Sequence, residues 1–373
     1  MVAETPEIHR SAALDSGVSS ELESFLKTTV APVANQLDTD SAALFETFNE
    51  LGKKGLLTPK NPQELGGMAL DVASYQRFQA LVARYSGALA FLLTQHQSAA
   101  SLLLGSAQTS LSQTYLPEMA TGERRIGVGF SQLRRLPSPL QAVPVSGGYR
   151  LNGTVPWVTG ADLFTHFVGA AVLPDGAAVF GLLPLVSQEA ESANTNDSGR
   201  LTVGAPMALA AMSATNTVEV QVENWFLSTD CVVGHRPAGW ISERDHANPL
   251  SPLGLMFGCS QASLDVLTAA LARRQIAHSI AEQLRLKLAW LQMDCPRVMA
   301  LPLEAYPQKL AFRGRAIALM NTCAQAAVVA SSGAANGLHH PAQRIYKESL
   351  VFSVSGQTTD VAIATLNNLL SSA

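Results

Sequence analysis

The chain has 373 residues, and a usual size of about 150 residues per domain predicts two or three domains. Hydrophobic residues make up 47% of the chain and charged residues only 14%, against about 25% in an average protein. This composition excludes intrinsic disorder and predicts that much of the protein surface is covered by a partner. The net charge of −4 provides no basic field that could hold a nucleic-acid backbone.

The first residues, Met1-Val-Ala-Glu-Thr-Pro-Glu7, carry acids and no apolar run, unlike a signal peptide, so we expect a cytoplasmic protein. The longest apolar candidate, residues 163–185, is interrupted by His166 and a Pro-Asp-Gly turn, so no membrane span is expected there. The four cysteines lie far apart without a CxxC pair, which predicts buried free thiols and no metal site.

Residues 1–123 are expected to form an N-terminal helical domain. Ser19 and Ser20 are predicted to cap a first helix that runs through Leu22 and Leu26. Apolar residues recur at helical spacing over 44–51, where Gly52 and Gly55 then end the helix, and long apolar helices are predicted over 72–104.

Residues 124–236 are expected to form a middle β domain. Two hairpins are predicted, one over 143–151 around Ser-Gly-Gly and one over 167–183 around Pro-Asp-Gly. Polar and apolar residues alternate over 217–222, which is typical of a strand with one face exposed to solvent. Residues 189–199 are predicted to form an exposed loop.

Residues 237–373 are expected to form a C-terminal helical bundle. Two helical stretches are predicted over 253–290, and a last helix over 359–370. The segment 310–330 is apolar on nearly all sides, which predicts a position inside a bundle or in a subunit interface.

Four short motifs occur in order along these three regions. They are Gly55-Leu-Leu with Pro62-Gln-Glu-Leu-Gly-Gly67, Tyr115-Leu-Pro-Glu-Met-Ala-Thr-Gly-Glu123, Tyr149-Arg-Leu-Asn-Gly-Thr-Val-Pro-Trp-Val-Thr-Gly160, and Pro341-Ala-Gln-Arg-Ile-Tyr-Lys-Glu348. Together they resemble the acyl-CoA dehydrogenase family. The resemblance implies an α+β fold with an N-terminal helical domain, a middle β-barrel or sandwich domain and a C-terminal four-helix bundle. It also implies FAD bound between domains, an acyl-CoA substrate, and a homodimer or homotetramer that completes the flavin site.

The resemblance assigns flavin contacts to particular residues. Trp157 and Thr159 match a family motif in which an aromatic ring covers the flavin, although a core strand Trp would give the same pattern. Ser131 stands where the family has a flavin-lining Thr, and Thr358 matches a Thr that touches the flavin.

The resemblance assigns two further FAD contacts near the ends of bundle helices, and in both places only part of the family motif is present. Arg273 keeps the Arg of a family motif that loses its aromatic residue here, and Gly333 belongs to a reduced Gly-rich loop. A simple helix C-cap would explain Gly333 equally well. The pair Arg134-Arg135 could meet a phosphate or could be an ordinary solvated pair.

The catalytic glutamate of the family aligns with Gly356, so the usual base is absent. Desaturation of an acyl thioester needs a group that removes the α-proton. Glu243 and Asp245 are candidates, and so are His339 and His340, which could instead be the polar start of a helix with Pro341 in its first turn.

Three functions therefore stay open. The first is an FAD-dependent acyl-CoA dehydrogenase-type oxidoreductase with an unusual base. The second is a reduced-flavin monooxygenase on the same fold, and the third is a binding or structural relative without catalysis.

Overall fold

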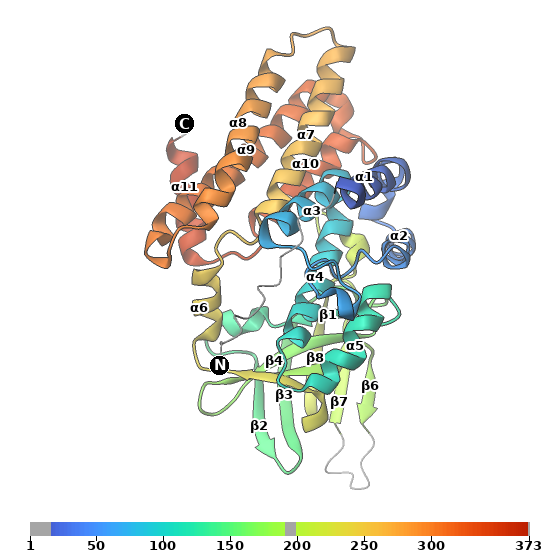
Figure 1. Ribbon diagram of the computed structural model, residues 1–373, viewed down its shortest axis with the longest axis vertical. Helices are drawn as coiled ribbons and strands as arrows, with labels where there is room; N and C mark the ends of the chain where they lie inside the picture. The colour runs from blue at the N-terminus through green and yellow to red at the C-terminus, as the bar shows by residue number, and fades with distance from the viewer. Residues whose placement is uncertain (1–15, 191–198, 372–373) are drawn as a thin grey trace, which may run out of the picture.

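The computed structural model describes residues 16–190 and 199–371. Figure 1 shows three parts along the long axis, with the N-terminal helices on one side, a sheet below and a helical bundle above. The helices are α1 Ser16–Phe25, α2 Ser41–Lys53, α3 Val72–Tyr85, α4 Gly87–Leu104, α5 Thr109–Thr121, α6 Trp240–Ala247, α7 Leu253–Arg273, α8 Ser279–Met299, α9 Tyr306–Ser331, α10 Pro341–Ser353 and α11 Thr359–Ser371. The strands are β1 Ile126–Gly129, β2 Leu140–Val145, β3 Gly148–Val158, β4 His166–Val172, β5 Ala178–Pro184, β6 Gln188–Ala190, β7 Gly199–Val203, β8 Val218–Ser228 and β9 Val232–Arg236.

The N-terminal helices begin where polar side chains cap them. Asp40 accepts hydrogen bonds from the first backbone amides of α2, and Ser86 caps α4 in the same way. The predicted cap at Ser19 and Ser20 is wrong, because α1 begins at Ser16 and places both serines inside the helix. The acidic segment Met1–Glu7 lies outside the described residues.

The middle region is one mixed nine-stranded sheet with the path β6-β7-β8-β3-β2-β4-β5-β9, and β1 joins β4. Both predicted hairpins are confirmed as the antiparallel pairs β2–β3 and β4–β5, and the alternating strand is β8. The pairs β1–β4 and β2–β4 are parallel, which hairpin signals alone could not indicate. Most of the predicted loop 189–199 lies outside the described residues.

The bundle α7–α11 packs on the N-terminal helices mainly through α3 and α7. The two helical stretches predicted over 253–290 are confirmed as α7 and α8, and the apolar segment 310–330 lies within α9. By length and composition α7 and the 303–336 segment could cross a membrane, but 67% and 44% of their most apolar windows lie buried in the fold. Core helices of soluble proteins have the same property. The four cysteines are free, and no metal-ligand cluster occurs within the described residues.

Two buried polar contacts fix the parts relative to one another. The His96 ring, on α4, bonds to Met119 O through Nε2 at 2.9 Å and accepts from the Ile126 amide through Nδ1 at 3.3 Å, which joins α4 to α5 and β1. Glu348, on α10, accepts from Arg344 at 2.6 Å and from the Gly87 amide at 3.1 Å. The bundle is therefore tied to the start of α4 by the hydrogen bond from the Gly87 amide to Glu348, a buried carboxylate that pairs with Arg344 within α10.

Candidate functional site

A cavity of about 700 Å³ opens where the sheet, α6 and the bundle meet. Four separate segments build it: the 3₁₀ turn η5 (Ser131–Arg134), α6, the start of α9 and the turn before α11. Its lining consists of Arg134, Ser242, Asp245, His246, Tyr306, Gln357, Thr358, Thr359, Asp360 and Ala362. Most of these side chains are polar, so the cavity can hold a ligand by hydrogen bonds as well as by contact.

The turn at Gly356 is held from behind by Arg313. This buried side chain donates to the carbonyl oxygens of Pro249, Ser355 and Gly356 at 2.8, 2.5 and 3.2 Å. Burial lowers the pKa of Arg313 to about 10. Gly356 has a φ of +61°, a left-handed conformation that glycine adopts without strain. Thr358 then accepts a hydrogen bond from the Val361 amide and starts α11.

The ionisable side chains of the cavity form two pairs. Arg134 donates two hydrogen bonds to Asp245, at 2.7 and 2.8 Å, so both carboxylate oxygens are engaged. Tyr306 donates to Asp360 at 3.1 Å, and burial together with this carboxylate raises the pKa of Tyr306. The His246 ring stacks on Tyr306 with 3.8 Å between the ring centres.

The imidazole of His246 makes no side-chain hydrogen bond within the described part of the chain. Its ring nitrogens therefore remain available to a ligand in the cavity. Neither His246 nor Tyr306 and Asp360 was a candidate from the sequence. They lie on α6, α9 and α11, far apart in the chain, and no short motif connects them.

The predicted flavin residues on the sheet side, Ser131, Trp157 and Thr159, do not line this cavity, although Ser131 lies in the turn η5 whose Arg134 does. Trp157 is 45% exposed on β3, an unusual position for a large aromatic side chain, and β3 packs on η5. Thr159 is buried and shares a hydrogen bond of 2.9 Å with Thr217, so its hydroxyl supports the end of β3. Ser131 begins η5, three residues before Arg134.

Two buried oxygens near the cavity lack a hydrogen-bond partner among the described residues, Ser131 Oγ and Gln357 Oε1. Such atoms are costly unless a ligand or water satisfies them. Ser131 lies in η5, and Gln357 directly precedes Thr358, so the two atoms belong to two of the segments that build the cavity. The polar edge of an isoalloxazine ring fits these groups, since it both donates and accepts hydrogen bonds.

A second set of predicted residues lies at the opposite end of the bundle. Arg273 ends α7, and the neighbouring Arg274 donates to Ala330 near the end of α9, which is followed by Gly333. His340 accepts from the Ala342 amide and caps α10. The structure therefore brings Arg273, Gly333, His339 and His340 toward one end, away from Thr358 within a single chain.

Comparison with known proteins agrees with this architecture. Residues 17–123 match the sequence profile of the acyl-CoA dehydrogenase N-terminal domain. The chain is 24% identical over 307 residues to the probable acyl-CoA dehydrogenase YngJ of Bacillus subtilis, covering 77% of each protein. The chain is therefore similar to acyl-CoA dehydrogenases in sequence.

Other proteins similar to this chain carry different names. The amino sugar nitrososynthase RubN8 of Streptomyces rubradiris is 29% identical over 253 residues, covering 64% of this chain and 57% of RubN8. Among solved structures, an acyl-CoA dehydrogenase from Geobacillus kaustophilus has a TM-score of 0.76 at 13% identity, covering 94% of this chain and 96% of that one. KijD3, solved with FMN and a dTDP-linked amino sugar, has a TM-score of 0.72 at 19% identity, covering 94% and 92%. These structural likenesses establish the fold.

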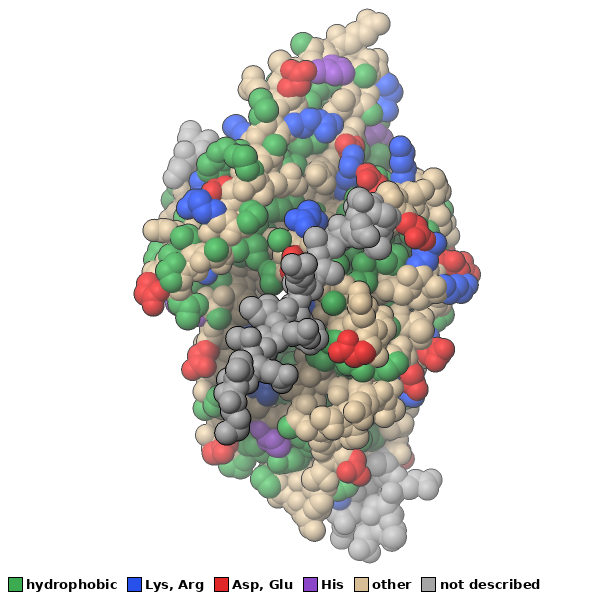
Figure 2. Space-filling model, viewed as in Figure 1, with side chains coloured by type: hydrophobic (Ala, Val, Ile, Leu, Met, Phe, Trp, Pro, Cys, Tyr) green, Lys and Arg blue, Asp and Glu red, His purple; other side chains and the backbone are tan. Residues whose placement is uncertain are grey.

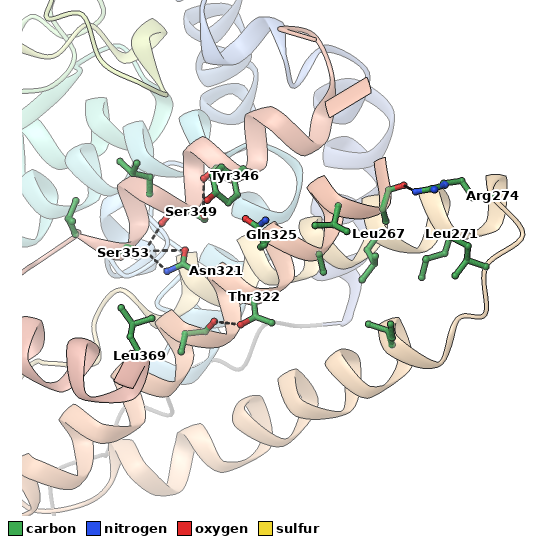
Figure 3. Close-up of a pocket in the computed structure, with 18 residues that line it drawn as sticks. Leu267, Leu271, Arg274, Asn321, Thr322, Gln325, Tyr346, Ser349, Ser353 and Leu369 are labelled. Carbon is green, nitrogen blue, oxygen red and sulfur yellow. Dashed lines mark hydrogen bonds between the residues drawn. The ribbon is translucent and has the colours of Figure 1, made fainter. Parts of the chain in front are cut away.

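A groove of about 910 Å³ runs along the bundle, between α7, α8, α9, α10 and α11. Figure 3 shows the apolar side chains of Leu267, Leu271 and Leu369 in its lining, together with polar side chains such as those of Asn321, Gln325 and Ser353. Several large apolar side chains around it are exposed, including Ile280, Val329 and Leu350 at more than half of their surface. Figure 2 shows further hydrophobic side chains over the bundle, on one face of the molecule.

The candidate bases differ in their placement. The turn before α11 carries an exposed glycine, Gly356, and therefore no carboxylate at that position. Asp245 lines the cavity but is held by Arg134, whereas Glu243 is exposed on α6 and does not line it. Arg134 is therefore partnered by a carboxylate in the described structure, while Arg135 is exposed.

Proposed function

We propose that this protein is a flavin-dependent oxidoreductase that binds FAD beside the cavity and oxidises the CH–CH group of an acyl thioester or a related substrate. The observation that carries the proposal is the pair of buried unpaired oxygens, Ser131 Oγ and Gln357 Oε1, in the two segments that flank the cavity. The similarity to acyl-CoA dehydrogenases and the structure of KijD3 with FMN support a flavin cofactor.

The chain's own residues would hold the cofactor in distinct ways. Trp157 offers an exposed flat apolar wall, while Ser131 and Gln357 offer a donor and an acceptor. A bound flavin supplies a hydride acceptor, which none of the amino-acid side chains provides. Arg313 and Thr358 keep the turn around Gly356 in place, so the polar side of the cavity is formed before a ligand arrives.

Proton removal falls to His246 in this proposal. The imidazole lines the cavity, is held in place by stacking on Tyr306, and makes no side-chain hydrogen bond to the described residues. It would take up the proton from the carbon next to the substrate carbonyl, because Asp245 is occupied by Arg134. The Tyr306–Asp360 hydrogen bond fixes the ring on which His246 stacks.

A reduced-flavin monooxygenase is the second candidate, and the absence of a carboxylate at Gly356 favours it. Oxygen activation by a reduced flavin does not need a base for α-proton removal. The nitrososynthase relative supports this alternative. His339 and His340 would not assist it within one chain, since they lie at the far end of α10, a helix of 13 residues or about 20 Å.

Oligomer formation and cytoplasmic location are part of the proposal. A homodimer or homotetramer would cover the groove on the bundle, where Ile280, Val329 and Leu350 are exposed. Gel filtration with light scattering tests this directly. A monomer at micromolar concentration would contradict it.

The central test is an absorbance spectrum of the purified protein, before and after incubation with FAD and with FMN. A flavin spectrum that bleaches without oxygen when acyl-CoA thioesters are added supports the dehydrogenase. Oxygen uptake coupled to product formation with supplied reduced flavin supports the monooxygenase. A protein that retains neither flavin would contradict both enzymatic functions, and a binding or structural role without catalysis would remain.

A matched pair of variants tests the flavin position. Trp157→Ala is expected to weaken flavin retention about tenfold or more, since a stacking aromatic contributes on the order of 1 kcal/mol or more. Phe226→Ala removes another exposed aromatic ring of the same sheet and should leave retention unchanged. Equal flavin content in the two variants would contradict the placement of the ring.

A further inference from the structure

The cavity between α6, α9 and α11 is polar over almost all of its lining. Among the described residues that line it, Ala362 is the apolar one, and the others carry hydroxyl, amide, imidazole, guanidinium or carboxylate groups. An alkyl chain in this cavity would take those groups away from water without replacing their hydrogen bonds, which costs free energy. The cavity therefore fits the polar part of a ligand better than a hydrocarbon chain.

The two carboxylates of the cavity differ in how far the chain neutralises them. Asp245 accepts from Arg134 with both of its oxygens, so this pair carries no net charge. The buried Arg313, whose charge reaches Asp245 and Tyr306, donates to three backbone carbonyl oxygens. Asp360 forms no ion pair within the described residues; its Oδ2 accepts from the Tyr306 hydroxyl, and its Oδ1 has no partner there. Asp360 is therefore the carboxylate that the described chain leaves without a cation.

The position of Asp360 in the first turn of α11 does not by itself explain this carboxylate. Polar side chains at a helix start commonly accept hydrogen bonds from the free backbone amides there. In α11 the Thr358 hydroxyl already accepts from the Val361 amide. The Asp360 carboxylate instead accepts from Tyr306 of α9, and both of these side chains line the cavity. Its Oδ1 is therefore available to a hydrogen-bond donor that enters the cavity.

Two hydroxyl groups add neutral hydrogen-bonding positions to the same cavity. Ser242 on α6 and Thr359 on α11 both line it, and neither hydroxyl has a hydrogen-bond partner within the described part of the chain. A hydroxyl both donates and accepts, whereas an ionised carboxylate only accepts. The free groups of the cavity thus match a ligand that carries a charged donor together with neutral polar groups.

We propose that the cavity takes a small polar substrate with a protonated amine. Its ammonium group binds Asp360, and its other polar groups bind the hydroxyls of Ser242 and Thr359. An ammonium group has three donors and no acceptor, and a hydrogen bond between charged groups is about twice as strong as a neutral one. The inference rests on the proposed function for the identification of this ligand as the substrate, and within that function it selects amine-bearing substrates.

Three stable probes test this proposal on the full chain: glucosamine, glucose and cyclohexylamine. Glucosamine and glucose differ in one ammonium group, and cyclohexylamine keeps the ammonium group without the hydroxyls. Affinities are measured by ligand-observed nuclear magnetic resonance titration, at low ionic strength and at a pH where the amines are protonated. Glucosamine is expected to bind about tenfold more tightly than glucose, as for the gain of one charge-assisted hydrogen bond, and more tightly than cyclohexylamine.

Variants of two carboxylates assign the preference to a position. Asp360→Asn keeps the size of the side chain without its charge, and it is expected to remove the preference for glucosamine over glucose. Asp360→Glu keeps the charge and should keep most of the preference. Glu243→Gln is the matched control, because Glu243 is exposed on α6 and does not line the cavity, so the preference should be unchanged. Added salt should weaken the binding of glucosamine and spare that of glucose.

Equal affinities for glucosamine and glucose in the unsubstituted protein, or no binding of either, would overturn the proposal. A preference that persists in Asp360→Asn, or that is lost equally in Glu243→Gln, would overturn it as well. Circular dichroism of each variant verifies that it is folded. Flavin content is measured on the same samples: a normal flavin spectrum without an amine preference refutes this site and spares the proposed function, whereas an amine preference in a protein that retains no flavin does the reverse.

Discussion

Introducing a glutamate at Gly356 restores the carboxylate that the family has at this turn, and the structure predicts both its cost and its effect. A Cβ at this position would lie 3.7 Å from Pro252 Cγ and 3.9 Å from Arg313 Nη2, which are ordinary contacts. The φ of +61° is the source of the cost, about 1–2 kcal/mol for a residue with a side chain. We therefore expect a folded protein whose melting temperature is a few degrees lower.

The new carboxylate would lie near the Arg313 guanidinium. A nearby positive charge lowers the pKa of a carboxylate, so the glutamate would be ionised at neutral pH but a weaker base than one in an apolar site. Flavin-loaded Gly356→Glu is expected to bleach with acyl-CoA without oxygen, faster than the unsubstituted protein. The anaerobic absorbance decay in a stopped-flow instrument measures this rate.

Gly356→Gln is the matched control, because it imposes the same backbone conformation without a charge. It should show the same loss of stability and no gain in bleaching rate. If neither substitution lowers the melting temperature, the left-handed turn is not what favours glycine here. If the two variants bleach at the same rate, the missing carboxylate is not what limits dehydrogenation.

Three further predictions concern the proton acceptor and the two buried contacts between the parts of the fold. His246→Gln is expected to lower turnover at least tenfold with flavin retention unchanged, measured by steady-state kinetics beside a flavin spectrum. His278→Gln, at the start of α8 and away from the cavity, should leave turnover unchanged. Glu348→Ala leaves Arg344 without its buried partner and should lower the free energy of unfolding by about 3–5 kcal/mol in urea; a change below about 1 kcal/mol would contradict the role of the ion pair. Burial lowers the pKa of His96 to about 4, so the folded protein resists a proton that the unfolded chain accepts below its usual pKa. The His96 contribution to the unfolding free energy is full above pH 6.5 and falls by about 3 kcal/mol as the pH drops to about 4, and His96→Gln should flatten that part of the pH profile.

The elements that local chemistry determines were predictable from the sequence. The Pro-Asp-Gly turn between β4 and β5 and the Ser-Gly-Gly turn between β2 and β3 fix hairpins through a few adjacent residues. The apolar segment at 310–330 became α9 because few of its residues can interact with water. The start of α1 was missed because several serines and a glycine in 16–20 leave the cap position ambiguous.

The site was predictable only where a motif carries it. The resemblance pointed to Thr358, which lines the cavity, and to Trp157, whose flavin role stays a prediction. Arg313, Tyr306 and His246 were not predicted, since their contacts join residues dozens of positions apart. Arg313 also lies in a segment that reads as an apolar core helix, where a buried cation is costly without acceptors. Its three backbone acceptors appear only when the Gly356 turn and Pro249 fold against α9.

The two groups of predicted flavin residues lie at opposite ends of the bundle, which bears on the assembly. The start of α7 lies beside Gly356, and Arg273 ends the same helix 21 residues later, about 31 Å away. Under the proposed function, Ser131, Trp157 and Thr358 of one chain would contact the reactive end of a flavin, and Arg273 and Gly333 would contact a different group. In a homo-oligomer that buries the groove along α7–α11, the second set of one copy would then approach the first set of another. The proposal thus connects the low charge content and the exposed apolar side chains of the bundle with the cofactor site.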